Sequence, residues 1–216
     1  DKCKSLKARA EANEAFGAEL KKGKKADAQR GYEIACKEWM DVRSFGQVFA
    51  FKGSDLSLGI RGPVSVQPAF SVDPIDITSM QITKSVNSED KEGKSSDTMG
   101  MKHRVDFGVY ILKGSINVQL SEKTGFTEED AEKIKEAIRT LFVNDSSSAR
   151  PDGSMVMHKL YWWKHNCKIG QYSSHKVHNS IEIKKKEGVR NPRKIEDYEI
   201  ICHELPGLAV EEYEGL

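Results

Sequence analysis

The amino-acid sequence predicts an α+β fold, and three observations support this prediction. Residues 4–41 are rich in strong helix formers, as in LKARAEANEAF. Residues 127–142 repeat apolar side chains at the helical period. Between these segments lies a run in which every second residue is apolar, the period of a half-buried strand: Val105, Phe107, Val109 and Ile111. Helical and strand-like segments thus alternate unevenly along one chain, as in α+β domains.

The second half of the chain reads strand, helix, strand, strand, strand. The run that starts at Val105 resumes after Gly114 with three further apolar residues, Ile116, Val118 and Leu120. The helix follows, and Thr127 with Asp130 resembles a capping box at its start. Further strands are expected in MVMHKLYWWKH (155–165), HKVHNSIEIKKK (175–186) and YEIICHEL (198–205). This order is compatible with a split βαβ sheet of the ferredoxin-like or RNA-recognition type.

The first half changes character near residue 42. A second helix is expected from about 26 to 40, with Tyr32, Ala35 and Trp39 on one stripe. Glycines then punctuate residues 44–66, where short strands are expected around Val48, Ala50 and Ile60. Strand-like flanks enclose the polar segment 86–97, so a long, protruding hairpin is expected from about Thr78 to Arg104.

Charge is balanced in total but unevenly distributed. The formal net charge is +1, which excludes a simple strongly basic nucleic-acid binder. Residues 184–194, however, hold six basic side chains and one acid, and residues 195–216 hold seven acids without Lys or Arg. Patches of opposite sign suit head-to-tail assembly or polyanion binding.

Cysteine spacing and hydropathy indicate a cytoplasmic protein without a membrane partner. Four cysteines occur, and none forms a CxxC pair: Cys3, Cys36, Cys167 and Cys202. The spacing suggests no disulfide framework, so a reducing compartment is expected. The chain has no apolar run of membrane-spanning length.

Metal binding and catalysis are weakly supported, and we expect neither a metal, a cofactor nor an active site. Four potential ligands lie close together, but their spacing matches no common structural zinc site: His165, Cys167, His175 and His178. His158 or His165 could act as a general acid or base. The sequence nevertheless lacks a recognisable nucleophile, P-loop or paired-carboxylate pattern.

Nucleic-acid binding is better supported. Phosphates favour Lys and Arg, unstacked bases favour apolar or aromatic faces, and glycine allows close backbone approach. The segment TMGMKHR (98–104) combines all three properties. The candidate RNA-binding residues are Arg43, Arg61, Lys84, Met99, Gly100, Met101, Lys102, His103, Arg104 and Lys168. The alternative for the basic run 102–104 is an ordinary solvated face.

Six short segments point to a family. In order they are DVRSFG (41–46), RGPVSVQ (61–67), SVDPI (71–75), TMGMKHRVDFGVY (98–110), TGFTEEDAEKI (124–134) and CKIGQYSSHKV (167–177). Together they closely resemble the backbone subunit of the type I-C CRISPR Cascade complex, the Csd-type branch of the RAMP-superfamily members called Cas seven. The resemblance runs from about Trp39 to Ile183. Its KIG…HK segment points to the I-C branch, while DVRxFG and GPV also occur in the I-B branch.

The resemblance implies an architecture and a function. It implies an RNA-recognition-like palm, with a helical insertion at 1–41, a connecting palm segment at 42–75, a thumb-like hairpin at 76–104 and the rest of the palm at 105–216. Copies of such a subunit stack along CRISPR RNA, contact other Cascade subunits, and leave guide segments free to pair with target DNA. The backbone subunit of this branch is not a nuclease.

The same resemblance gives positions to the candidate residues. Met99, Met101 and the basic run 102–104 would lie where the thumb returns to the palm, and Arg43 and Arg61 would contact phosphates. Relatives begin with a strand and an Asn-Pro-Asn-Gly-Asp-Pro-like turn, which is not present here. We therefore expect that an N-terminal segment is missing from this chain.

Two alternatives remain at this point. One is a CRISPR RNA-processing endoribonuclease of the same superfamily. The other is a protein-only assembly module whose basic and acidic faces meet each other.

Overall fold

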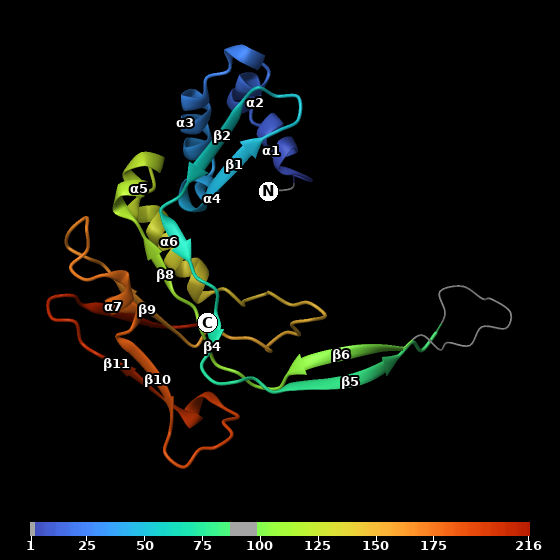
Figure 1. Ribbon diagram of the computed structural model, residues 1–216, viewed down its shortest axis with the longest axis vertical. Coiled ribbons are helices and arrows are strands. Elements are labelled where there is room, and N and C mark those ends of the chain that lie inside the picture. Colours follow the sequence, from blue (N-terminus) through green and yellow to red (C-terminus); the bar gives the residue numbers. More distant parts are fainter. Residues whose placement is uncertain (1–2, 87–98) are drawn as a thin grey trace. The chain divides into compact units, whose positions relative to one another are not determined.

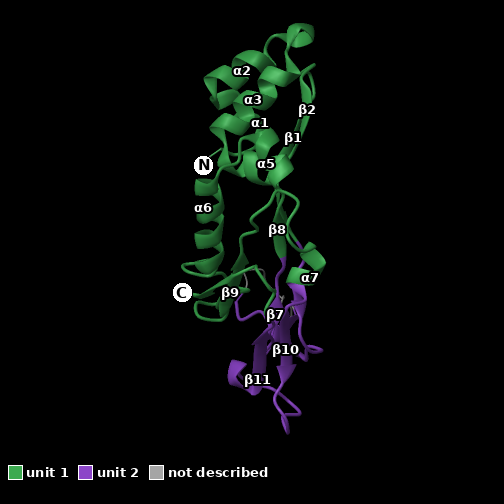
Figure 2. Ribbon diagram, turned by 90° about the vertical axis from the view of Figure 1, so that its left-hand side faces the viewer, with its two compact units in different colours: residues 1–66, 114–177, 204–216 green, residues 67–113, 178–203 purple. Residues whose placement is uncertain are grey.

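The structure is a computed structural model that describes residues 3–86 and 99–216. It forms two compact units, each built from separate stretches of the chain (Figures 1 and 2). Unit 1 comprises residues 1–66, 114–177 and 204–216, and unit 2 comprises residues 67–113 and 178–203. Helices and antiparallel strands occur together, which confirms the predicted α+β class.

Unit 1 contains most of the helices. Its elements are α1 (Leu6–Ala12), α2 (Glu14–Leu20), η1 (Gly23–Lys25), α3 (Ala28–Glu38), α4 (Met40–Phe45), β1 (Gly46–Ala50), β2 (Ser57–Arg61), β3 (Val64–Val66), β8 (Gly114–Ile116), α5 (Val118–Thr124), α6 (Glu128–Arg139), β9 (Lys159–Trp163), α7 (Ser174–His178) and β12 (Val210–Glu214). Its antiparallel ladders join β1 with β2, β3 with β8, and β9 with β12. The last residue of α7 belongs to unit 2.

Unit 2 contains strands and one short 3-10 turn. Its elements are β4 (Phe70–Ser71), β5 (Ile77–Thr83), β6 (Met99–Val105), β7 (Tyr110–Ile111), β10 (Ile181–Lys185), η2 (Ile195–Asp197) and β11 (Tyr198–Cys202). Here β4 pairs with β7, β5 with β6, and β10 with β11, again antiparallel. The strands of both units are thus paired two by two within the part of the chain that the structure describes.

The main hydrophobic core lies in unit 1, between helices α1–α4 and the β1–β2 hairpin. Phe16, Trp39 and Phe49 form its centre, with ring centroids 4.9–5.7 Å apart. Tyr32, Ala35 and Trp39, predicted to share one helical stripe, all pack into this cluster. Asn13 separates α1 from α2 because its side chain accepts a hydrogen bond from the Phe16 N–H, which starts a new helix.

Helix α6 begins as the sequence predicts. Thr127 Oγ1 accepts the backbone N–H of Asp130, and the Asp130 carboxylate accepts the N–H of Thr127. The same carboxylate receives two hydrogen bonds from Arg43 of α4, Nε–Oδ2 at 2.8 Å and Nη2–Oδ1 at 2.6 Å. Its side chain is only 2% exposed. The Arg43 guanidinium, above all, lowers the pKa of Asp130 to about 2.

The C-terminal half of α6 is attached to the β9–β12 ladder by Lys135. Its ammonium donates to Glu132 at 2.8 Å and to Glu211 at 3.0 Å, and lies over the rings of Trp162 and Tyr213. Burial opposes the charged form, but the carboxylate partners more than offset it, so the pKa of Lys135 is raised.

Two segments that were expected to be strands throughout are partly helical. Val118 and Leu120 belong to α5, because the Asn117 side chain accepts the Leu120 N–H and starts a helix that ends at left-handed Gly125. His175 and His178 lie in α7 and not in a strand, so the strand expected at 175–186 begins only at Ile181. At α5 the Asn117 side chain thus overrides the apolar spacing, and at α7 the Ser173 hydroxyl accepts the Lys176 N–H at 3.3 Å, which favours a helical start.

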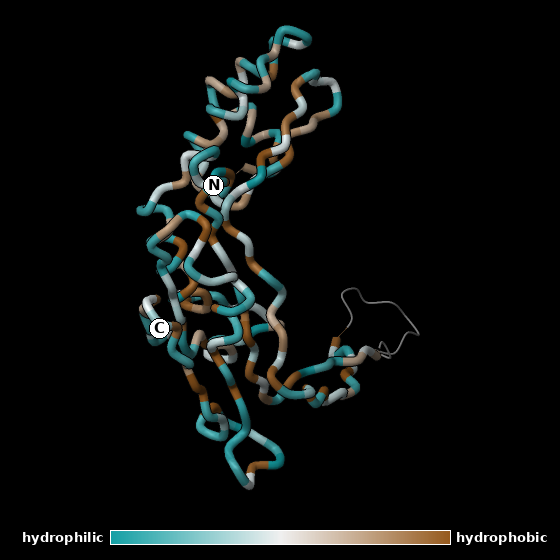
Figure 3. Tube along the Cα trace, turned by 60° about the vertical axis from the view of Figure 1, so that its left-hand side comes forward, coloured by the Kyte–Doolittle hydropathy of each residue, from teal (hydrophilic) through white to brown (hydrophobic). Residues whose placement is uncertain are grey.

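Unit 2 has little enclosed core. Tyr198 is buried, and Phe107 lies beside it with ring centroids 6.5 Å apart. Along the β5–β6 hairpin, apolar residues lie among hydrophilic ones on both strands (Figure 3). Only Thr78 of this hairpin's two strands is even partly buried.

Membrane insertion through a helix finds no support. Within residues 3–86 and 99–216, every helix is too short or too polar to span a bilayer.

The Arg43–Asp130 pair leads to the first prediction. Asp130→Asn keeps the shape of the side chain but removes its charge, so we expect the free energy of unfolding to fall by about 2 kcal/mol at neutral pH. Because folding lowers the pKa of Asp130, its stabilisation is complete above the ordinary pKa of 3.8 and is lost as the pH falls towards about 2. Urea unfolding of both proteins over this pH range measures the difference.

Glu129→Gln is the matched control. Glu129 lies in the same helical turn, but its partner Lys133 and its own side chain are well exposed. We expect the control to change stability by less than about 0.5 kcal/mol. Equal stability of Asp130→Asn and wild type at neutral pH would contradict the stabilising role of the pair.

Candidate nucleic-acid interface

The β5–β6 hairpin carries six of the ten residues expected to bind RNA, and a seventh, Lys84, directly follows β5. Its two strands pair over seven positions each, from Ile77 opposite Val105 to Thr83 opposite Met99. Directly paired residues of antiparallel strands project from the same face, and successive residues project from opposite faces. The register therefore assigns each residue of the hairpin to one of two faces, which the sequence alone did not do.

One face is basic. We call it the basic face: Thr78, Met80, Ile82, Gly100, Lys102 and Arg104. Lys102 stands opposite Met80, and Arg104 stands opposite Thr78. Met80 and Ile82 are 41% and 47% exposed, so two cations lie beside accessible apolar side chains. Gly100 is opposite Ile82, where a Cβ would make only ordinary van der Waals contact, so the glycine leaves the Ile82 side chain uncovered.

Arg104 is held in place by Asp106, the residue that directly follows β6. Its Nε donates to Asp106 Oδ1 at 2.7 Å, and Thr78 Oγ1 donates to the other oxygen of Asp106 at 2.8 Å. These two hydrogen bonds, from Thr78 first and then Arg104, lower the pKa of Asp106. The Arg104 side chain remains 55% exposed and keeps its terminal nitrogens available for an anion.

The opposite face is half apolar and carries no Lys, Arg, Asp or Glu. We call it the methionine face: Ile77, Ser79, Gln81, Thr83, Met99, Met101, His103 and Val105. Met99 and Met101 are 64% and 57% exposed. His103 Nδ1 and Ser79 Oγ share a hydrogen bond of 2.8 Å. His103 thus points away from Lys102 and Arg104, although the three are consecutive in the sequence.

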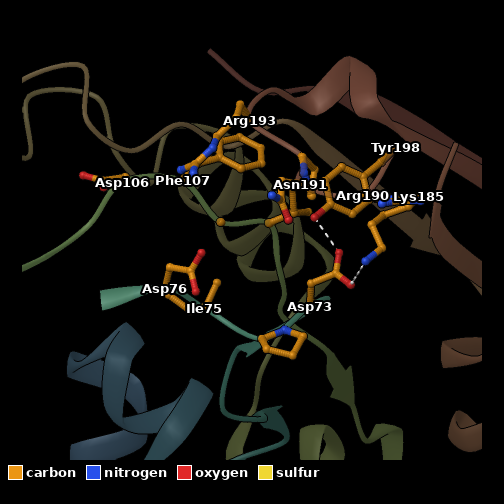
Figure 4. Close-up of a pocket in the computed structure, with 14 residues that line it drawn as sticks. Asp73, Ile75, Asp76, Asp106, Phe107, Lys185, Arg190, Asn191, Arg193 and Tyr198 are labelled. Atoms are coloured by element: carbon orange, nitrogen blue, oxygen red, sulfur yellow. Dashed lines mark hydrogen bonds and ion pairs between the residues drawn. The ribbon is translucent and has the colours of Figure 1, made fainter. Parts of the chain in front are cut away.

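The base of the hairpin is fixed by a carboxylate network in unit 2. Asp73 accepts a hydrogen bond from the Tyr198 hydroxyl at 2.7 Å, and its other oxygen lies 3.1 Å from Lys185 Nζ (Figure 4). Burial, followed by the bond to Asp73, raises the pKa of Tyr198 to about 12. The Tyr198 hydroxyl in turn lowers the pKa of Asp73. The segment leading into β5 is therefore attached to β11 by a hydrogen-bonded, partly buried acid.

The remaining candidates differ in how far their charges are already paired. Lys84 follows β5 and is exposed. Arg61 ends β2 in unit 1, is exposed, and has no ion-pair partner among the residues that the structure describes. Arg43 is committed to Asp130, and Lys168 forms an ion pair with Glu122 while remaining well exposed. RNA contact by these four residues stays a prediction.

A family model now adds an independent observation. The model of the CRISPR-associated protein Cas7 matches residues 2–203. The chain belongs to the Cas7 family. Membership supports a CRISPR-associated, RNA-binding backbone role, which agrees with the coarse function inferred from the six ordered segments. None of the curated proteins compared with the chain matches it.

One histidine of this Cas7 chain has a clear structural role. His165 Nδ1 accepts the backbone N–H of Gln171 at 3.0 Å, which closes the loop around Lys168. Gln171 in turn donates to the Gly207 carbonyl at 2.6 Å. Across residues 3–86 and 99–216, no group of three His, Cys, Asp or Glu side chains is arranged to hold a metal ion.

Two arginines at the base of the hairpin belong to the basic run 184–194, which the sequence indicated as a possible polyanion-binding patch without naming either of them as a candidate RNA-binding residue. Arg190 and Arg193 line a cavity of about 260 Å³. The signal was present in the sequence as the basic run 184–194, but a charge run alone does not indicate which side chains meet a cavity.

Tyr198→Phe tests the network at the base of the Cas7 hairpin. The change removes the hydroxyl that donates to Asp73, so we expect the free energy of unfolding to fall by about 1 kcal/mol. Because the pKa of Tyr198 is raised by folding, its stabilisation is complete below the ordinary pKa of 10.0 and is lost as the pH rises through about 12. Ultraviolet titration of wild type against Tyr198→Phe should show a tyrosine that ionises near this high pH; a difference curve centred near 10 would contradict the network.

Proposed function

We propose that this chain is the backbone subunit of a type I-C Cascade complex, and that its copies assemble along CRISPR RNA and present guide segments to target DNA. Family membership supports the CRISPR-associated, RNA-binding role, and the KIG…HK segment at 168–176 supports the I-C branch. The single observation that carries the RNA-binding part is the basic face of the hairpin, where Lys102 and Arg104 stand beside exposed apolar side chains.

The chemistry of the basic face suits single-stranded RNA. Lys102 and Arg104 are two positions apart on one strand, so their charges project from one face and can meet the sugar–phosphate backbone. Met80 and Ile82 on the partner strand offer apolar surface to a base displaced from its stack. A hairpin exposed along both strands can insert between nucleotides as a thumb, while its base stays attached through Asp73 and Tyr198.

The methionine face suits a protein partner better than a phosphate backbone. It carries no Lys or Arg among the paired positions of the hairpin, and the exposed side chains of Met99 and Met101 are adaptable apolar groups. We propose that a neighbouring copy covers Met99 and Met101 when subunits assemble. His103 shares this face, so we expect it to contribute less to RNA binding than Lys102 and Arg104.

Salt-dependent RNA binding tests the proposal. Affinity for single-stranded RNA should fall steeply with salt, and Lys102→Ala/Arg104→Ala should reduce the slope of log K against log salt by about 0.7 for each phosphate that no longer meets a cation. Filter binding over a salt series gives both slopes. Lys24→Ala/Lys25→Ala removes the same charge from unit 1, and His103→Ala changes the methionine face; both should leave the slope near the wild-type value.

A flat salt series for the wild type would overturn RNA binding through phosphates. A slope that falls equally in Lys102→Ala/Arg104→Ala and Lys24→Ala/Lys25→Ala would instead show general charge attraction and remove the hairpin from the interface.

We further propose that the subunit is a non-catalytic scaffold. The observed role of His165 as a hydrogen-bond acceptor for the loop at Gln171 supports this, because that nitrogen is already engaged. Incubation with CRISPR repeat RNA, with and without Mg²⁺, should leave the RNA intact. Discrete products that disappear in His158→Ala or His165→Ala would favour an endoribonuclease and contradict the scaffold.

A further inference from the structure

The cavity at the base of the hairpin is lined by arginine and aromatic side chains to which the function proposed above assigns no role. It lies within unit 2 and is formed by three stretches: residues 73–76 before β5, residues 106–109 after β6, and residues 185–198 between β10 and β11 (Figure 4). All three are fixed locally. Asp73 is bonded to Tyr198, Asp106 to Thr78, and the loop at 193–194 donates two backbone N–H groups to Asp197.

The cavity lining holds three cations and three acids, but two of the acids are already paired. Asp73 is paired with Lys185, and Asp106 is paired with Arg104. Arg190 and Arg193 are exposed, and within the described ranges neither has a carboxylate at ion-pair distance. Arg193 also helps to lower the pKa of Asp106, after Thr78 and Arg104. Asp76 is the one lining acid without an ion pair among the described residues, so Arg190 and Arg193 face a single unpaired carboxylate. Arginine is well suited to bind phosphate because its planar fork donates two parallel hydrogen bonds.

An aromatic ring completes the site. Phe107 lines the same cavity and is half-buried, with Tyr198 beside it at a ring-centroid distance of 6.5 Å. Gly108 follows directly, and a Cβ there would lie 2.7 Å from Ile75 Cδ1, so the glycine allows the chain to pass close to Ile75. An aromatic face next to guanidinium groups is the combination that single-stranded nucleic acid requires, a ring on which a base stacks and cations that pair with a phosphate.

We propose that this cavity binds one nucleotide of the single-stranded RNA, with its phosphate on Arg190 and Arg193 and its base against Phe107. The proposal rests on the RNA-binding function proposed above and adds a second contact point at the foot of the hairpin. A volume of about 260 Å³ accommodates a single base with part of its ribose. The exposed carboxylate of Asp76 can accept a hydrogen bond from a base amino group or from a ribose hydroxyl.

An acidic peptide is the less suitable occupant. Its carboxylates could pair with the two arginines, but Asp76 would repel them, and a carboxylate gains nothing from the face of Phe107. A nucleotide uses the arginines, the ring and the acid together.

The charge contribution is tested with paired double variants. Arg190→Ala/Arg193→Ala should weaken binding of a short single-stranded RNA and reduce the salt slope by about 0.7 for each phosphate that these arginines bind in the wild type. Lys184→Ala/Lys186→Ala removes the same charge from the same basic run without touching the cavity lining, and should have a clearly smaller effect.

The base contribution is tested without changing charge. Phe107→Leu should weaken binding of the intact RNA about tenfold, the typical effect of removing the ring under one stacked base. An abasic oligomer of the same length offers phosphates but no bases, so wild type and Phe107→Leu should bind it equally. A thermal unfolding curve close to that of the wild type verifies that Phe107→Leu leaves the fold intact.

The outcomes separate this site from the function it rests on. If the wild type does not bind single-stranded RNA, both proposals fail. If the wild type binds, but the two double variants behave alike and Phe107→Leu affects intact and abasic RNA equally, the nucleotide cavity is overturned while RNA binding stands. A loss confined to Arg190→Ala/Arg193→Ala and a base-dependent loss in Phe107→Leu would support it.

Discussion

The Asp130 carboxylate is the point on which the organisation of unit 1 depends. It completes the capping box at the start of α6 and also receives the paired donors of Arg43 from α4, 87 positions earlier in the chain. A buried acid is tolerated only when its oxygens are fully bonded, and here four donors meet it. Lys135 fixes the C-terminal half of the same helix between acids and rings. Helix α6 is thus positioned by charge at its start and in its C-terminal half.

Much of the fold could be predicted from local sequence. The stripe of Tyr32, Ala35 and Trp39 and the capping box at Thr127 have short-range causes, and both are confirmed. The prediction was wrong where a local cap competed with apolar spacing. Val118 and Leu120 fit a strand by period, but Asn117 provides the acceptor that starts a helix. The spacing of apolar residues alone does not distinguish a strand from a helix here, because a segment of seven residues is long enough for either structure.

The candidate site was predictable in composition but not in geometry. The sequence shows Lys102, His103 and Arg104 as one basic run, yet strand register places His103 on the face opposite the other two. Arg43 was expected to be a phosphate ligand, whereas its partner Asp130 is remote in sequence and could not be inferred from spacing. Arg190 and Arg193 become candidate RNA ligands because they line one cavity with Phe107 and Asp76, which belong to different stretches of the chain.

Two stretches of backbone pass each other at close range in unit 1. Gly46, at φ 84°, and Gly62 lie where the turn after α4 passes the end of β2, and a Cβ on either would fall on backbone atoms: the Ile60 carbonyl for Gly46 and the Ser44 carbonyl for Gly62. Side chains elsewhere in the core can change rotamer to absorb a misfit, but two segments of peptide backbone cannot. A side chain at either glycine therefore cannot be accommodated by small local shifts. With both glycines present the β1–β2 hairpin closes on α4, and without one of them the two segments must separate.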